Sequence, residues 1–392
     1  MAIRTGQTVD DRVCALGVYP NADELKGRHW KSFASEIDAL GAEMRSMIGQ
    51  EDFAHFKKLE LWGRLATVLG YATAWILPNP ISAFLISQGN YARWSLALHT
   101  VSHGAFDRLP QVPERYKSSG FAKGWRRLVD WLDWIEPTHW DDEHNHLHHF
   151  HLGSPKDPDV VSRNTEYIQS VKSPILRYFL FFVMATIWKP AYYAVNTLAE
   201  SRYQKGLLPT NRIGWNNWNP MTPEGRELWS KCFAPYFLFR FVLLPALFLP
   251  LGTTAALFVL INSILAEAMT NLHSFAMIAP SHTGDDVYMF GDSAKGKADY
   301  YLRQIVGTVN YPAGSDIADF FYGGMNYQIE HHLWPEASLL QCQRVRPRLK
   351  EVCRRYGVHY AEESLFKRLV STFSIVTGRG QQAVKFSREK SA

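Results

Sequence analysis

The chain has 392 residues, a formal net charge of +5, and 46% hydrophobic and 20% charged residues. This length allows one large domain or two small ones. The apolar content is ordinary and the mean hydropathy is slightly negative, which excludes a chain that lies mostly within a bilayer and allows only a few membrane spans beside a large aqueous part. The four cysteines have no CxxC spacing, so no disulfide framework is expected.

The first predicted element is an amphipathic stretch over residues 32–58. Phe33, Ile37, Leu40 and Met44 recur on one broad stripe of a helix. An ordinary packing helix and a helix that lies in the membrane interface explain this stripe equally well. We expect residues 1–60 to form a cytosolic N-terminal segment.

Two pairs of apolar stretches predict two membrane hairpins, and therefore four spans. The first pair covers residues 61–77 and 81–103, and the second covers 232–251 and 253–279. About twenty residues suffice to cross the hydrocarbon core, and both hairpin tips are uncharged, which suits the outer side. A further apolar stretch, 175–199, contains Lys189-Pro190. This pair is costly in a spanning helix, so we expect the stretch to lie in the interface or to be only partly inserted.

The connecting loop 108–172 is rich in lysine and arginine, and the positive-inside rule places it in the cytoplasm with both termini. From residue 281 onward the chain is again polar and basic, and residues 361–392 are expected to form a cytosolic tail. The basic positions from Arg344 to Arg355 are expected to be a solvated helix face, with attraction to anionic lipid as the alternative.

Three histidine clusters stand beside the apolar stretches. A single histidine is usually a core or surface residue, but three clusters with the spacing of one helical face predict a metal centre. Imidazole suits zinc, copper, iron and nickel alike, and the clusters offer enough ligands for two metals. The clusters comprise His99 and His103; His144, His148 and His149 within W-D-D-E-H-N-H-L-H-H-F-H at 140–151; and Gln328, His331 and His332.

A metal centre at the mouth of apolar helices indicates an apolar substrate. No side chain can break an unactivated C–H bond, whereas oxygen activated at iron can. A membrane metal transporter is the alternative from a different class, but transporters place their ligands inside the spans near the midplane. Here nearly all of the clustered residues fall at span ends or in loops.

The motifs H-T-V-S-H, H-N-H-L-H-H and Q-I-E-H-H resemble the three histidine boxes of the membrane fatty acid desaturases. The segment 323–335 is similar to the third box of the front-end desaturases, in which glutamine replaces the first histidine. D-P-D-V at 157–160 and the segment 347–360 are also similar to that group. The resemblance covers residues 61–360, which we expect to be the desaturase domain.

This resemblance implies an all-α integral membrane fold with four transmembrane helices and a cytosolic helical cap over a di-iron centre. It also implies a tunnel for a fatty acyl lipid or acyl-CoA, O2 as co-substrate and two external electrons per turnover. No H-P-G-G haem motif of a fused cytochrome b5 occurs, so a separate donor of the ferredoxin or cytochrome b5 type is expected. A lipid hydroxylase of the same family is the enzymatic alternative, and no nucleic-acid partner is expected.

The resemblance assigns the box histidines as metal ligands and adds one further histidine after the last span. His282 is preferred for that role because of its placement relative to the third box, and His273 is the competing residue. Further candidates for the metal or for orienting its ligands are His146, His151, Gln328, Asp107 and Glu330.

Overall fold

The computed structural model describes residues 19–20, 23–161 and 165–385, which are mostly helical with one pair of short strands. Up to the first histidine cluster the elements are η1 (Glu24–Lys26), α2 (Arg28–Ser46), α3 (Gln50–Ala74), α4 (Pro80–Ala92), η2 (Arg93–Leu98) and α5 (His99–Ser102). The loop and second cluster contain η3 (Glu114–Tyr116), η4 (Gly124–Arg126), α6 (Arg127–Asp130), α7 (Pro137–Trp140), η5 (Asp141–His148) and α8 (His149–His151).

The central part contains α10 (Glu166–Ser170), α11 (Pro174–Thr186), η6 (Lys189–Tyr193), α12 (Ala194–Gln204), α13 (Trp215–Trp218), α14 (Pro223–Glu227), η7 (Leu228–Phe233), α15 (Ala234–Phe237), η8 (Leu238–Leu243), α16 (Leu244–Ala246), η9 (Leu249–Leu251), α17 (Thr253–Ile278) and η10 (Ala279–His282). The C-terminal part contains β1 (Tyr288–Phe290), α18 (Lys297–Val306), α19 (Asp316–Tyr322), η11 (Met325–Tyr327), α20 (Gln328–Leu333), α21 (Leu339–Tyr356), α22 (Leu365–Val376) and β2 (Ala383–Lys385). β1 and β2 pair in parallel, with Tyr288 opposite Ala383.

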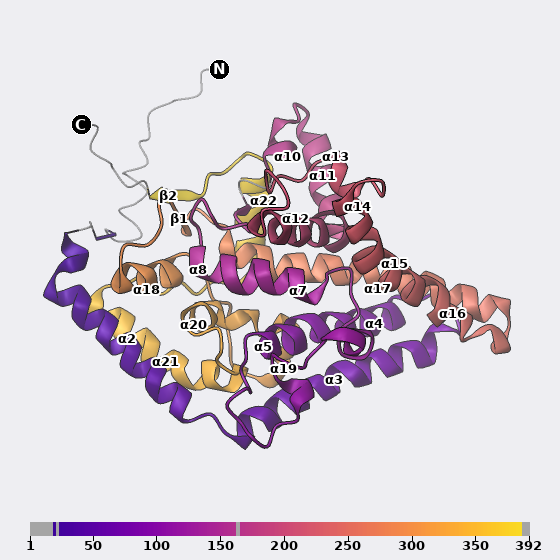
Figure 1. Ribbon diagram of the computed structural model, residues 1–392, viewed down its shortest axis with the longest axis horizontal. Helices are drawn as coiled ribbons and strands as arrows, with labels where there is room; N and C mark the ends of the chain where they lie inside the picture. The colour runs from indigo at the N-terminus through magenta and orange to yellow at the C-terminus, as the bar shows by residue number, and fades with distance from the viewer. Residues whose placement is uncertain (1–18, 21–22, 162–164, 386–392) are drawn as a thin grey trace.

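Two helical segments of the described chain are long and apolar enough to cross a membrane, Trp215–Leu251 and Thr253–His282. They correspond to the second predicted hairpin. The first predicted hairpin is present as α3 followed by the continuous helix α4–η2–α5, but neither arm meets the same length and composition criterion. One reason is that the first half of α3 carries many charged side chains. Figure 1 shows both hairpins extending to the same side of the molecule.

The two helices of the first hairpin, α3 and α4, pack closely because small residues line their contact. A Cβ atom added to Gly89 of α4 would lie 1.9 Å from the Thr67 hydroxyl oxygen and 2.8 Å from the Gly63 carbonyl oxygen of α3. Asn262 of α17 also holds the tip of the first hairpin, since its Nδ2 donates to the Ala74 carbonyl at 2.8 Å and its Oδ1 accepts the Asn79 N–H at 2.9 Å. The remaining faces of α3 and α4 expose a row of apolar side chains. The row is Leu61, Leu65, Val68, Leu69, Ile81 and Phe84, with Ile76 and Leu77 at the tip.

On the other side of the histidine clusters, α2, α18, α20 and α21 form a helical layer (Figure 1). The apolar stripe of α2, including Phe33 and Ile37, is fully buried against this layer, so it is a packing surface. The single amphipathic stretch predicted over 32–58 is wrong in one respect. It is two helices, because the chain turns at Gly49, whose N–H donates to Asp52 at the start of α3 at 2.9 Å.

The apolar stretch 175–199 is divided into α11, η6 and α12. The 13 residues of α11 span about 20 Å, less than a hydrocarbon core of about 30 Å. α11 packs on α22 through Tyr178 and Phe373, whose ring centroids are 5.2 Å apart. Arg368 of α22 is buried and donates to the Thr283 carbonyl at 2.6 Å, so this C-terminal helix is joined to the chain just after η10.

Candidate metal centre

The three histidine clusters and the chain after α17 converge at the centre of the protein. One ring nitrogen from each member of a first group lies within 4.8 Å of the others, and the same holds for a second group. The first group is His99, His103, His144, His149 and His331; the second group is His148, His282 and His332. The groups are adjacent, because the ring centroids of His149 and His332 are 4.5 Å apart.

A π-helical turn places His144 beside both of the following box histidines. His144 and His148 share a face, as predicted, with stacked rings whose centroids are 5.3 Å apart. The segment η5 is π-helical, and its wider turn also brings His149 to 4.8 Å from the His144 ring. His144 and His149 belong to the first group and His148 to the second, and His144, His148 and Asp159 form a third, overlapping group.

All of the clustered rings except His148 are in the chemical state that metal binding requires; burial opposes protonation of His148, but the charge and hydrogen bond of Asp157 raise its pKa. Burial lowers the pKa of His144, His149, His331 and His332 well below the usual value, and the neighbouring imidazoles lower it further. These rings are therefore neutral and offer lone pairs.

Several buried ring nitrogens also make no hydrogen bond within the described chain: His103 Nε2, His144 Nδ1, His149 Nδ1, His282 Nδ1 and His331 Nε2. In addition, His144 Nε2 lies 3.0 Å from His99 Nε2 and 3.2 Å from His149 Nε2, and a single ring nitrogen cannot satisfy both. Buried polar atoms are normally bonded. The donor set therefore fits metal ions.

Two side chains orient members of the second group. Asp157 Oδ1 lies 2.9 Å from His148 Nδ1, and Gln304 Oε1 lies 3.2 Å from His332 Nδ1. Burial opposes ionisation of Asp157, but His148 and the backbone N–H groups of Gly153 and Asp159 hold its pKa below the usual value. Carboxylates and amides that bond the second ring nitrogen of a ligand histidine fix its orientation. Asp157 lies in the D-P-D-V segment, but its role was not predicted, and neither was that of Gln304.

The two competing histidines lie in different surroundings. His282 is in the second group. His273 is outside both groups: its Nδ1 lies 3.0 Å from Gln88 Nε2 and its Nε2 lies 2.9 Å from the Phe321 carbonyl oxygen.

The other predicted residues bond elsewhere or lie apart from the two groups. His146 is exposed, with Nδ1 2.9 Å from the Asp141 carbonyl oxygen, and His151 is half-buried outside the groups. Asp107 accepts the Ser118 N–H at 2.8 Å. Glu330 accepts from Tyr360 and, at 2.8 Å, from Asn310. Within the described chain neither Asp107 nor Glu330 contacts a clustered histidine, so their predicted orienting role has no support in the structure.

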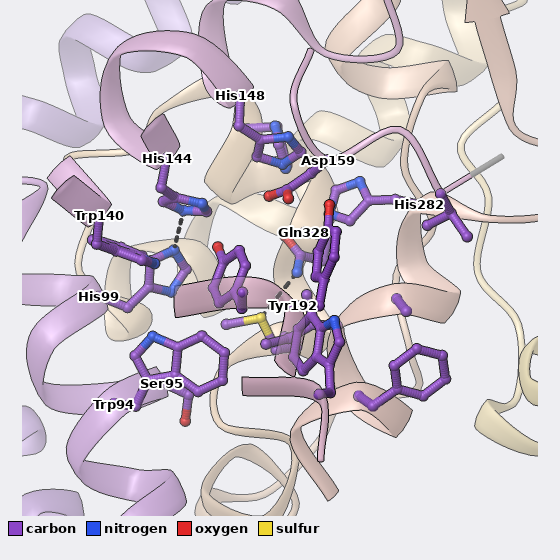
Figure 2. Close-up of a pocket in the computed structure, with 18 of the residues that line it drawn as sticks. Trp94, Ser95, His99, Trp140, His144, His148, Asp159, Tyr192, His282 and Gln328 are labelled. Atoms are coloured by element: carbon purple, nitrogen blue, oxygen red, sulfur yellow. Dashed lines mark hydrogen bonds between the residues drawn. The ribbon is translucent and has the colours of Figure 1, made fainter. Parts of the chain in front are cut away.

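An apolar cavity ends on the two groups (Figure 2). The cavity is narrow: the centre of a water-sized sphere can occupy about 80 Å³ of it. Its metal-facing end is lined by His99, His144, His148, His282, His332, Gln328 and Asp159, and the rest by Trp94, Met184, Trp188, Tyr193, Phe275 and Ile278. An apolar chain bound here would have one of its carbons next to both histidine groups.

The comparisons with known proteins agree on one family. Residues 73–364 match the family "Fatty acid desaturase". The chain is 26% identical over 355 residues to the "NADPH-dependent stearoyl-CoA 9-desaturase" of Mycobacterium tuberculosis (strain ATCC 25618 / H37Rv), with 85% of this chain and 76% of the relative covered. It is 24% identical over 325 residues to the chloroplastic "Acyl-lipid (7-3)-desaturase" of Chlamydomonas reinhardtii, covering 79% of this chain and 59% of the relative.

Proposed function

This chain belongs to the fatty acid desaturase family and desaturates fatty acyl chains, and from that premise we propose that its two histidine groups hold two iron ions that use O2 for the reaction. The observation that carries the proposal is the apolar cavity whose end is formed by members of both groups. When bound, the iron pair would supply the O2 activation needed to remove two hydrogen atoms from adjacent carbons of the chain.

The residues of the chain have three separate tasks in this proposal. The two histidine groups hold the metals, and Asp157 and Gln304 orient His148 and His332. The aromatic and aliphatic cavity binds the acyl chain and excludes water from the reacting carbons. Because the cavity is apolar along most of its lining, its shape selects which carbons meet the histidines.

We further propose the four-span arrangement, with the active site and both termini in the cytoplasm. The apolar rows exposed on α3 and α4 support this arrangement, since a soluble surface rarely exposes such rows. The basic loop and the basic C-terminal part support the orientation. Residues 1–60, 61–360 and 361–392 would then be the cytosolic N-terminal segment, the desaturase domain and the cytosolic tail.

We propose an acyl chain carried by CoA or by a glycerolipid as the substrate, because one relative is named for stearoyl-CoA and another for acyl-lipid. Electrons come, in this proposal, from a separate carrier of the ferredoxin or cytochrome b5 type. The mycobacterial relative is NADPH-dependent by name, which favours NADPH as their ultimate source.

The test is expression in a host whose fatty acids are then separated by gas chromatography as methyl esters. The wild-type protein should add a double bond and hold about two irons per chain. His148→Ala and His331→Ala, one from each group, should abolish the product and lower the iron content. His359→Ala, at an exposed position outside both groups, should do neither. A hydroxylated product, or full activity with one zinc per chain, would contradict the proposal.

A further inference from the structure

A buried ion pair lies directly behind the acyl cavity. The Lys189 ammonium group pairs with the Asp133 carboxylate, and the two residues are only 1% and 4% exposed. Removing two charges from water is unfavourable, and their pairing only partly offsets it. An ion pair among apolar helices is therefore a sign of a function beyond stability.

The ion pair touches the cavity through one aromatic wall, which consists of Trp94, Trp188 and Tyr193. Lys189 Nζ lies 4.6 Å from the centre of the Trp94 ring, in the geometry of a cation–π contact. Trp188 precedes Lys189 in the chain and stacks on Tyr193, with centroids 5.1 Å apart and planes 11° apart. All three rings line the cavity, and Figure 2 shows Trp94 away from His148 and His282.

The backbone of Lys189 is also fixed to α17. Its N–H donates to Asn271 Oδ1 at 2.7 Å, and Asn271 Nδ2 donates to the Glu267 carbonyl at 2.8 Å. The Glu267 carboxylate in turn accepts from Trp134 at 2.7 Å and from Tyr236 at 2.6 Å. This network holds the segment that carries the wall.

Two helical segments connect the wall to the histidine groups. α17 continues from Asn271 to η10, where His282 joins the second group. Trp94 of η2 lies five positions before His99 of the first group in the same continuous helix. The wall and its anchor are therefore fixed relative to both groups.

We propose that the Lys189–Asp133 pair is a positioning device that sets which carbon of the acyl chain lies at the histidine groups. An acyl chain that displaced the wall would have to separate the two buried charges. If apolar side chains stood in place of the ion pair, they could repack around the displaced wall. The pair acts through the wall and touches no reacting atom. The inference rests on the proposed function of the cavity as the acyl site.

The test compares product double-bond positions by mass spectrometry of derivatised fatty acids. The variant Lys189→Met/Asp133→Leu removes both charges while keeping apolar bulk, so no unpaired ion is left. We expect the single wild-type isomer to become a mixture in which a neighbouring position makes up at least a tenth of the product, with unchanged iron content. Lys189→Arg keeps the charge and should retain the wild-type isomer as the main product.

Lys297→Met is the matched control, since it breaks an exposed ion pair with Asp38 in the layer formed by α2 and α18. It should leave the isomer unchanged. If the double variant does not accumulate, the same product analysis is made with Trp94→Phe, which replaces a ring of the same wall by a smaller one. An unchanged single isomer in the deciding variant overturns the inference. Absence of any desaturated product from the wild-type protein would instead overturn the proposed function.

Discussion

His273 and His282 differ in what their ring nitrogens contact. Both nitrogens of His273 already lie within hydrogen-bond distance of protein atoms, Gln88 Nε2 and the Phe321 carbonyl oxygen. His282 has its ring 5.0 Å from the rings of His148 and His332, and its buried Nδ1 makes no hydrogen bond within the described chain. Of these two histidines, only His282 is therefore arranged as a metal ligand.

From this contrast we predict that His282→Ala abolishes desaturation and lowers the iron content of the purified protein. His273→Ala should retain its iron, with activity reduced through packing, because it loses only protein–protein hydrogen bonds. Metal analysis beside the product assay separates the two effects. Iron lost from His273→Ala and kept in His282→Ala would move the ligand to the deeper residue.

The carboxylate of Asp157 allows a second test of the metal centre. Asp157→Asn keeps the size of the side chain but removes the charge opposite His148 Nδ1. Loss of such an orienting group costs roughly 10–100-fold in metal affinity or activity. We expect iron to leave this variant at a correspondingly lower chelator concentration, whereas Asp107→Asn, whose carboxylate bonds Ser118, should behave like the wild type.

The residues of the metal centre were predictable where their spacing within the sequence was informative. The histidines of all three boxes and His282 were candidates from the sequence, and the structure brings them together. Gln304 was not, because it reaches His332 only through the packing of α18 against α20. The closeness of His149 to His144 could not be predicted either, since it depends on a π-helical turn.

At the scale of elements, the apolar stretches indicated helices but not where those helices break. The stretch 175–199 was expected to stay out of a full crossing because of Lys189-Pro190. The structure ends α11 at Thr186 and buries that lysine against Asp133, a partner 56 positions away in the sequence. The break at Gly49 was missed: the apolar stripe ends at Ile48, but the predicted stretch was continued to Lys58.

The α3–α4 hairpin yields a prediction about packing. A methyl group at Gly89 would collide with the Thr67 side chain and the Gly63 carbonyl, and the backbone contact cannot be relieved by a rotamer change. Overpacking of this kind typically costs about 1–3 kcal/mol. Gly89→Ala should therefore lower the thermal unfolding midpoint in detergent, while Ala72→Val, at an exposed position of α3, should not. Equal midpoints for the two variants would show that the helices are not in close contact.

At the scale of the whole molecule, apolar and charged surfaces are segregated. The hairpins expose apolar rows, and the layer containing α2 and α21 carries the ion pairs Arg348–Glu43, Arg355–Glu36 and Arg344–Glu51. These three arginines, expected to lie on a solvated face, thus also join α21 to the N-terminal helices. The partners lie about 300 positions apart, so the sequence pattern alone could not pair them. The expectation is wrong for Arg346, which is buried and pairs with Glu362 at 2.8 Å.

This segregation leads to a test of the four-span arrangement. Thr254 is exposed at the tip of the second hairpin and Leu77 at the tip of the first, whereas Glu351 is exposed on α21 in the opposite layer. Single cysteines at these positions can be probed with a thiol reagent that does not cross membranes. Cys14→Ser serves as background, because Cys232, Cys342 and Cys353 are buried.

In intact cells the reagent should label Leu77→Cys and Thr254→Cys, and it should reach Glu351→Cys only after permeabilisation. The reason is that moving the basic layer across a bilayer would place its lysines and arginines on the outer side, against the positive-inside rule. Labelling of Thr254→Cys without Leu77→Cys would mean that only the two segments Trp215–Leu251 and Thr253–His282 cross. In that case α3 and α4 would lie on the membrane surface with their apolar rows in the interface. The acyl chain would then have to enter the cavity from the membrane interface.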